Sequence, residues 1–182
     1  MKRVLSILFA LYLMPFVAQA QESTPITVDN MRPFHSIRVL GNLSVEISAS
    51  KDKPSMYVDI KGNDPRRFDW SVRDSVLTLS FSANSNGNAV QVKLSSPTPI
   101  EKLTIKRADV QLCDMPTTPL VDVALSEGAR LSGCVNCLDM HLKLTGRSVA
   151  NMTGRAKYQT ISVSRKSALN VCKVEGCSTE LQ

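Results

Sequence analysis

The sequence has few aromatic residues and, after its first 20 positions, no long hydrophobic run. Only 5% of the 182 residues are Phe, Trp or Tyr, so the chain offers no series of rings on which nucleic-acid bases could stack. Lys and Arg outnumber Asp and Glu by 22 to 16, but the excess is spread along the chain rather than gathered in a tail or stripe. Composition therefore argues against nucleic-acid binding and favours a globular protein of one domain.

The single long apolar segment lies at the N-terminus. Lys2 and Arg3 precede an apolar run over 4–18, and the small residues before Gln21 suit a signal peptidase. This pattern predicts a signal peptide over 1–20, cleaved after Ala20. No later segment supplies the roughly 20 apolar residues of a membrane-spanning helix, and no Cys lies at the cleavage site to accept a lipid. We expect an exported protein in the periplasm or at the cell surface.

The remaining chain alternates apolar and polar residues. A short lead-in with two prolines, 21–33, is expected to be flexible. From residue 34 on, apolar residues recur at every second position, as in strands with one face in a core. Clusters of Gly, Pro, Asn, Asp and Ser separate these runs, and no apolar stripe of helical spacing lasts for three turns. The pattern predicts an all-β protein in which 34–182 form a single domain.

An internal repeat in the second half indicates the architecture. Val123, Leu142 and Ile161 follow one another at the same step along the chain, and Leu103 begins an earlier copy. A second apolar position follows in each copy, and it aligns Leu131, Met152 and Val171. Because a repeat of about 19 to 21 residues is too short for a propeller blade, we expect a parallel β-helix or β-solenoid with coils of that length. A β-sandwich is the alternative, since short strands with regular turns also form sandwiches.

Several segments resemble a known family. The residues F-H-S-I-R-V-L-G-N-L-S-V-E-I-S at 34–48, M-Y-V-D-I-K-G at 56–62 and V-L-T-L-S-F at 76–81 are similar to the start of the putative auto-transporter adhesin head GIN domain. The repeats L-S-E-G-A-R-L-S-G and L-T-G-R-S-V-A-N-M-T-G resemble its stacked turns. The resemblance implies an exported β-helix protein of Bacteroidetes-type bacteria with an adhesive role and no catalytic residues. The chain departs from this family at Arg165-Lys166-Ser167 and in its five cysteines.

The five cysteines all lie between position 113 and the C-terminus of a chain expected in an oxidising compartment, which favours disulfides. In a stack of strands about 4.8 Å apart, Cys113 and Cys134 would be neighbours within disulfide range. Cys172 and Cys177 would close a short loop, which leaves Cys137 without a partner. Other pairings stay open. A four-thiolate zinc site built on Cys134 and Cys137 is disfavoured because Cys172 and Cys177 have the wrong spacing.

No arrangement of residues points to catalysis. His35 and His141 lie far apart in the sequence, and the acidic residues Asp109, Asp122 and Asp139 fall at different phases of the repeat. A catalytic site needs titratable groups that converge. We therefore predict no catalytic residue, no cofactor and no metal site.

These observations favour a non-catalytic binding or adhesin-like module for a glycan or another envelope component. One candidate surface is a column of basic turn residues, Arg147, Arg165 and Lys166, in which Arg147 and Lys166 are separated by the same step as the apolar repeat. Like charges stacked in this way repel one another unless an anion lies against them. A structural subunit that oligomerises by end-to-end stacking is the alternative function, and a polysaccharide-acting β-helix enzyme is a weaker one.

Overall fold

The computed structural model of this chain describes residues 25–82, 89–170, 174–175 and 178–181. Nearly all of its regular structure is β-strand, as the alternation of the sequence requires. The strands are β1 (Ile26–Val28), β2 (Ser36–Gly41), β3 (Leu43–Ala49), β4 (Ser55–Asp59), β5 (Phe68–Arg73), β6 (Val76–Phe81), β7 (Val90–Ser96), β8 (Lys102–Lys106), β9 (Asp109–Cys113), β10 (Thr118–Ser126), β11 (Arg130–Leu144), β12 (Val149–Val163), β13 (Ala168–Asn170), β14 (Val174–Glu175) and β15 (Ser178–Leu181). One 3-10 turn, η1 (Pro65–Arg67), precedes β5. Among the described residues, no helix is long and apolar enough to cross a membrane.

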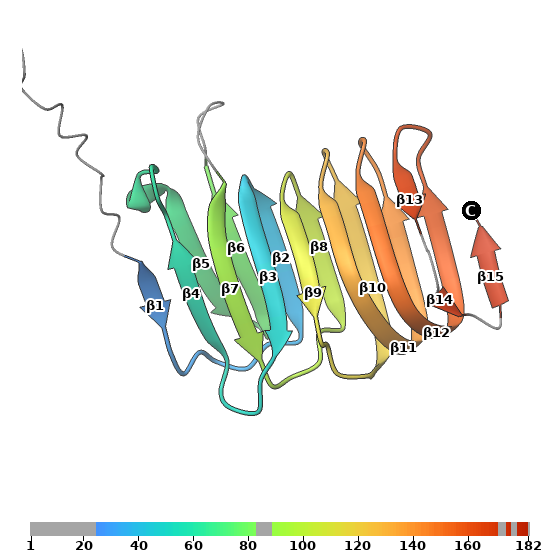
Figure 1. Cartoon of the computed structure of the whole chain (residues 1–182), viewed down its shortest axis with the longest axis horizontal. Helices are drawn as coiled ribbons and strands as arrows, with labels where there is room; N and C mark the ends of the chain where they lie inside the picture. Colours follow the sequence, from blue (N-terminus) through green and yellow to red (C-terminus); the bar gives the residue numbers. More distant parts are fainter. Residues whose placement is uncertain (1–24, 83–88, 171–173, 176–177, 182) are drawn as a thin grey trace, which may run out of the picture.

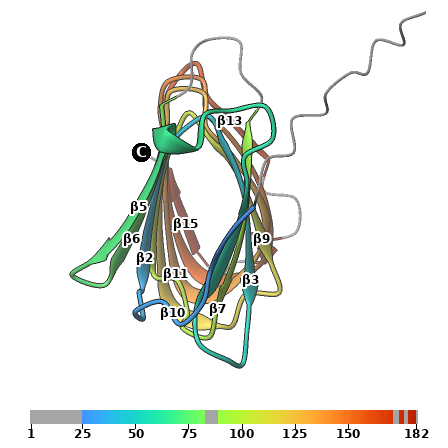
Figure 2. The same ribbon diagram turned by 90° about the vertical axis from the view of Figure 1, so that its left-hand side faces the viewer.

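The described strands form one sheet, in the order β1-β4-β7-β3-β9-β11-β10-β8-β2-β6-β5, and β12 joins it beside β11. The sheet folds back on itself (Figures 1 and 2). We call β4, β7, β3 and β9 the front layer and β5, β6, β2 and β8 the back layer. The first residues of β11 pair with β9, and its last residues pair with β10, which in turn pairs with β8. Because β11 and β12 bend from one layer into the other, the whole is an open, curled half-barrel.

This architecture confirms the all-β class and corrects the predicted parallel β-helix or β-solenoid. The solenoid prediction is wrong because the strands do not build separate stacked coils: β11 and β12 carry one continuous sheet around the bend, and the sheet stays open at its ends. The antiparallel pairs β1–β4, β4–β7 and β5–β6 also interrupt the parallel order. The alternative of a β-sandwich is wrong as well, since both layers belong to the same sheet.

The spacing that suggested coils is nevertheless the spacing of neighbouring strands. Val123 pairs with Leu142, which pairs with Ile161, and all three side chains are buried. The second alignment differs, because Leu131 pairs with Ala150 and Met152 pairs with Gly133. A large residue therefore lies beside a small one in each pair. This arrangement fills the space between the strands without the crowding that two bulky side chains would cause. Val171, the third member of that alignment, lies outside the described residues.

Apolar side chains between the two layers form one core. Each strand contributes alternate residues, as the pleat of a strand dictates. The largest fully buried side chains are Phe34, Ile37, Leu43, Ile47, Met56, Ile60, Leu77, Leu79, Leu94, Leu103, Ile105 and Leu125. Part of the segment expected to be a flexible lead-in also joins the sheet, since Ile26–Val28 forms β1 and Met31 is buried.

Candidate functional site

Four tight turns follow one another along the upper edge of the sheet in Figure 1. They connect β8 to β9, β10 to β11, β11 to β12 and β12 to β13, and we call them the turn edge. Their backbones are joined to one another: the Gly128 N–H donates to the Gly146 carbonyl at 2.7 Å, and the Ser164 N–H donates to the Leu144 carbonyl at 2.9 Å. The strand register therefore continues into the turns.

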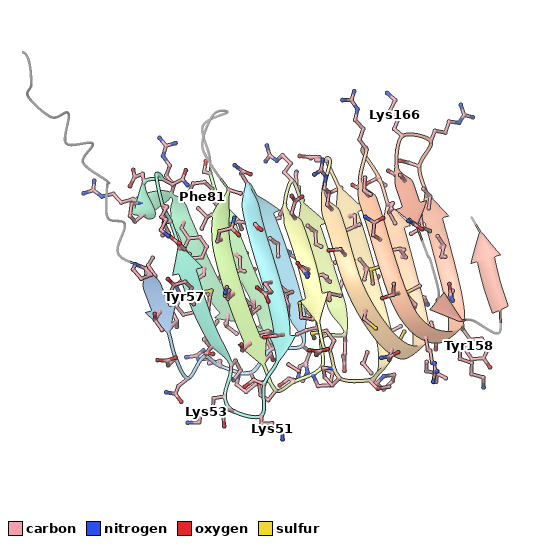
Figure 3. The ribbon with its side chains drawn as sticks, viewed as in Figure 1. Lys51, Lys53, Tyr57, Phe81, Tyr158 and Lys166 are labelled. Atoms are coloured by element: carbon pink, nitrogen blue, oxygen red, sulfur yellow. The ribbon has the colours of Figure 1, made fainter. Side chains whose placement is uncertain are left out.

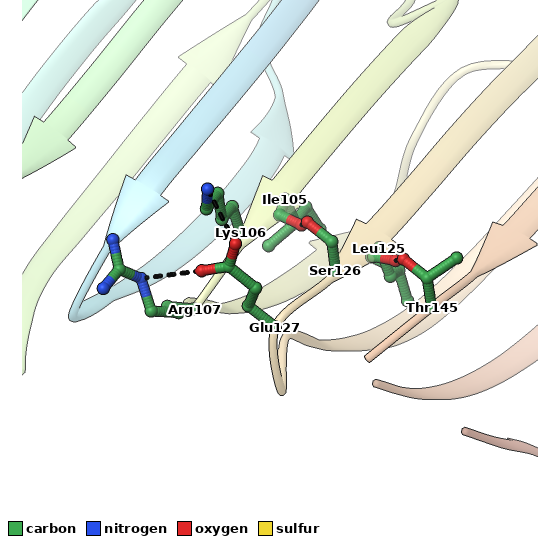
Figure 4. Close-up of polar contacts among 7 residues, drawn as sticks. All are labelled: Ile105, Lys106, Arg107, Leu125, Ser126, Glu127 and Thr145. Atoms are coloured by element: carbon green, nitrogen blue, oxygen red, sulfur yellow. Dashed lines mark hydrogen bonds and ion pairs between the residues drawn. The ribbon is translucent and has the colours of Figure 1, made fainter. Parts of the chain in front are cut away.

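Hydroxyl groups hold the turn edge further in place. The Thr145 Oγ1 donates to the Leu125 carbonyl at 3.1 Å, as the close-up in Figure 4 shows. The buried Ser148 hydroxyl donates to the Thr145 carbonyl at 2.6 Å. The Leu125 carbonyl also accepts the Thr145 N–H at 2.9 Å, so Thr145 is held to it through both its backbone and its side chain. Side chains at the tips of the turns thus project from a well-supported backbone.

The turn between β10 and β11 carries an acidic residue that faces two basic residues, Lys106 at the end of β8 and Arg107 in the turn after it. The Glu127 carboxylate lies 2.7 Å from the Lys106 Nζ and 3.3 Å from the Arg107 Nε (Figure 4). The hydrogen bond from Lys106 holds the pKa of the Glu127 carboxyl below its ordinary value, and the charges of Lys106 and Arg107 act in the same direction. Two positive charges at this end of the turn edge are therefore partly balanced by one negative charge.

The next two turns carry basic residues without such a balance. Arg147 lies in the turn between β11 and β12, and Arg165 and Lys166 lie in the turn between β12 and β13. All three are exposed, and none forms an ion pair with an acidic side chain in the part of the chain that the structure describes. Figure 3 shows Lys166 pointing away from the edge. We call Arg147, Arg165 and Lys166 the basic ridge.

The cysteines lie away from the turn edge. Leu112 of β9 pairs with Gly133 of β11. Cys113 and Cys134 are the next residues on these two neighbouring strands, so they come directly after the same paired position. Both are free thiols in the structure, as is Cys137, and the proposed bridge between Cys113 and Cys134 stays a prediction. Cys172 and Cys177 lie outside the described residues.

The C-x-x-C pair, Cys134 and Cys137, does not face one ligand. Cys134 is exposed and Cys137 is buried, so their thiols point to opposite sides of β11. Burial raises the pKa of the Cys137 thiol and, together with the Glu46 carboxylate, that of the Cys113 thiol. Among the residues with described positions, no group of three or more His, Cys, Asp and Glu side chains could hold a metal ion.

The structure also shows a groove that the sequence analysis missed. It has a volume of about 320 Å³ and lies on the solvent side of the front layer. Its residues come from the neighbouring strands β7, β3, β9, β11 and β12. Its walls are polar side chains at the outward positions of these strands. The polar residues that line the groove were visible in the sequence, at every second position of the predicted strands. Alternation alone, however, does not tell which polar residues of distant segments become neighbours.

The fold and these two surfaces define an all-β protein whose candidate sites are open surfaces rather than enclosed pockets. Comparison with known proteins identifies the family: residues 33–180 match the model of the "Putative auto-transporter adhesin, head GIN domain". The chain therefore belongs to this family, as the resemblance of its segments predicted. No curated protein matches it in sequence.

Solved structures show the same fold at low sequence identity. An adhesin candidate from Bacteroides fragilis has a TM-score of 0.76 and 18% identity, over 87% of this chain and 76% of that one. A similar protein from Parabacteroides distasonis, also described as an adhesin, has a TM-score of 0.65 and 17% identity, over 87% and 76% of the two chains. A third, from the same organism and described as a lipid-binding protein, has a TM-score of 0.65 and 13% identity, over 88% and 78%.

Proposed function

We propose that this chain is a non-catalytic binding module, exported to the periplasm or cell surface, which holds an anionic component of the cell envelope on its basic ridge. The observation that carries the proposal is the contrast within the turn edge. Lys106 and Arg107 share an acidic partner, whereas Arg147, Arg165 and Lys166 share none among the described residues.

Electrostatics give this contrast a direction. Neighbouring parallel strands are about 4.8 Å apart, so consecutive turns bring like charges within one Debye length at physiological salt. Their repulsion is relieved when the side chains spread into water or when an anion lies between them. A polyanion with regularly spaced charges can contact both turns at once, which a small ion cannot do.

Anionic glycans are the ligands that we favour, because the family and two of the similar structures are described as adhesins. The similar structure described as a lipid-binding protein suggests a second source of the same chemistry, an anionic lipid headgroup. Both sources present phosphate, sulfate or carboxylate groups to the ridge, which Arg and Lys recognise through charge-assisted hydrogen bonds.

The test compares two charge-reversed double variants. Arg147→Glu with Lys166→Glu reverses the ridge, and Lys51→Glu with Lys53→Glu makes the same change in net charge at the opposite edge of the sheet (Figure 3). Retention on heparin and on immobilised lipopolysaccharide at about 0.1 M salt should be lost in the ridge variant and kept in the control. Vesicles with anionic lipid headgroups test the lipid source separately.

Two results would contradict the proposal. Unaltered retention of the ridge variant would exclude this surface as the site. Equal loss in both variants would show that only net charge matters. Thermal melting of both proteins shows whether the substitutions disturb the fold, and we expect equal melting temperatures because all four side chains are exposed.

A further inference from the structure

The groove on the front layer is built from two rows of polar side chains that cross the strands. Lys93 of β7, Glu46 of β3 and Gln111 of β9 are paired in register, and the same row continues through Ser132 of β11 to Asn151 of β12. Each step is one strand, about 4.8 Å. Five side chains that line the groove thus stand in a row at right angles to the strands.

A second row runs beside the first. Gln91 is paired with Ser44, Ser44 with Asp109, and Asp109 with Arg130. Because residues two apart on a strand share a face, this row lies next to the first on the same face. Both rows stand on a floor of residues that are buried in the core, among them Val45, Val92, Val110 and Leu131. The positions of the polar groups are therefore set by the sheet.

Most of these side chains have no partner within the described part of the protein. Lys93 is paired in register with Glu46, and Asp109 with Arg130, yet neither pair forms a salt bridge. Two groove side chains do have a partner: the Cys113 thiol donates to the Glu46 carboxylate at 3.9 Å and also interacts with the side chain of Gln111. Opposite charges directly across a sheet commonly attract each other. Here their hydrogen-bonding capacity stays directed outward.

The chemistry of the groove suits hydroxyl groups better than an anion. Gln91, Gln111 and Asn151 present planar amides that both donate and accept hydrogen bonds. Two basic side chains, Lys93 and Arg130, are matched in number by Glu46 and Asp109, so the groove has no excess of positive charge. A saccharide presents neighbouring hydroxyls that also donate and accept, and charged and amide side chains can each bind two of them.

An exposed aromatic side chain extends the first row at its β4 end. Tyr57 is paired with Lys93, and 41% of it is exposed; Figure 3 shows it on the front of β4. Tyrosine combines an apolar ring with a hydroxyl, so it can pack against the apolar face of a sugar ring while the adjacent polar row binds the hydroxyls.

We infer that this polar groove binds an uncharged oligosaccharide, extended across the strands from β4 towards β12. The row repeats at each strand, at a spacing close to the length of one pyranose residue, so successive sugar units meet successive strands. This site is separate from the basic ridge and goes beyond the function proposed above, because its ligand is recognised through hydroxyl groups rather than charge.

The test uses the full mature chain and a panel of neutral hexasaccharides that includes gluco-, manno-, xylo- and galacto-configured chains. Binding is measured by calorimetry and on a glycan array. We expect at least one panel member to bind. Gln111→Ala combined with Asn151→Ala should lower the affinity for this saccharide by about tenfold or more, since two side chains that can each form two hydrogen bonds are removed. Tyr57→Ala should lower the affinity for the same saccharide.

The matched control is His141→Ala combined with Lys143→Ala, two exposed outward residues of β11 that lie outside the groove. It should bind as the unmodified protein does. Binding should also persist when salt is raised from about 0.05 M to about 0.5 M, whereas retention on a polyanion falls over that range.

The outcomes separate this inference from the proposed function. Absence of binding to every member of the panel at millimolar concentration, or unchanged binding by the groove variant, would overturn the inference. The ridge variant should keep its affinity for the neutral saccharide, and the groove variant should keep its retention on heparin. Loss of saccharide binding in the ridge variant alone would place the saccharide site on the ridge and would also contradict the inference.

Discussion

The two halves of the sheet bury the same kind of core with different strand pairings. From β8 to β13 all pairs are parallel, and each strand is offset from its neighbour by nearly the same length of chain. In the N-terminal half, β4 and β5 run antiparallel to their neighbours, and the antiparallel β1 lies at the edge. Parallel strands need a connection that returns to the starting edge, so a regular parallel region leaves a constant spacing in the sequence, and antiparallel hairpins leave none.

The regular half depends on close contact between neighbouring backbones. Gly154 has φ of 123°, and a Cβ added there would lie 1.9 Å from the Val135 carbonyl oxygen on the adjacent strand. Gly154→Ala should therefore separate β11 from β12 and cost on the order of 3–5 kcal/mol in unfolding free energy. Chemical denaturation measures this loss.

Gly128 supplies the control for Gly154. It also has a positive φ, but nothing lies within 4 Å of an added Cβ. Gly128→Ala should cost only about 1–2 kcal/mol, the strain of the left-handed backbone. Similar losses for the two variants would show that the approach of β11 to β12 is not the limiting contact.

Removal of a core side chain tests whether the regular half shares its core with the rest of the molecule. Leu142, 2% exposed, lies between Val123 and Ile161. Leu142→Ala should leave a cavity and cost about 2–5 kcal/mol. Leu79→Ala, in the N-terminal half, should cost a similar amount and give the same single unfolding transition.

The exposed neighbour Lys143 provides the reference for Leu142. Lys143→Ala should change the melting temperature little, because the side chain is on the outward side of β11. Equal melting temperatures for the Leu142 and Lys143 variants would contradict the core position of Leu142. Two separate transitions in either core variant would show that the two halves unfold independently.

A disulfide between Cys113 and Cys134 would add a covalent link within the regular half. Its loop of about 20 residues predicts a stabilisation of about 2–4 kcal/mol. Peptide mapping of non-reduced protein, alkylated as the cells are opened, should recover the linked pair, and free thiols at both positions would refute it. Because burial raises the pKa of the Cys113 thiol, oxidation in vitro should be faster at alkaline pH, where the thiolate forms.

The smallest expected effect concerns the two ends of the turn edge. Lys106 and Arg107 lower the pKa of Glu127 in the folded protein. The stabilising contribution of this pair is therefore present above the ordinary pKa of the carboxyl and is lost as the pH falls through the lowered folded-state value. Protonation also frees two basic residues, so retention on heparin should rise at acid pH.

Glu127→Gln should reproduce this rise at neutral pH and remove its pH dependence, with a modest increase in the salt concentration that elutes the protein. Asp122→Asn serves as the control, since its ion pair with Lys102 joins β10 to β8 and lies outside the turn edge. An equal increase in both variants would mean that the turn edge has no special part in retention.

Much of this protein could be predicted from local patterns. Alternation identified the strands, because a half-buried strand must place apolar residues at every second position, and the steps from Val123 to Leu142 and Ile161 gave the register of β10, β11 and β12. The family could be recognised from the same segments. The pairing of Leu131 with Ala150 could not, since apolar size alone suggested Met152.

Only the tertiary structure decided how these strands close. A constant step between apolar residues is compatible with coils, with a sandwich and with a curled sheet, because it records which residues are neighbours and not how β11 bends between layers. The balance of Glu127 against Lys106 and the meeting of Lys93, Glu46, Gln111, Ser132 and Asn151 were likewise decided in three dimensions. Outward polar residues carry no periodic signal of their partners, since water satisfies them in any arrangement until the fold brings them together.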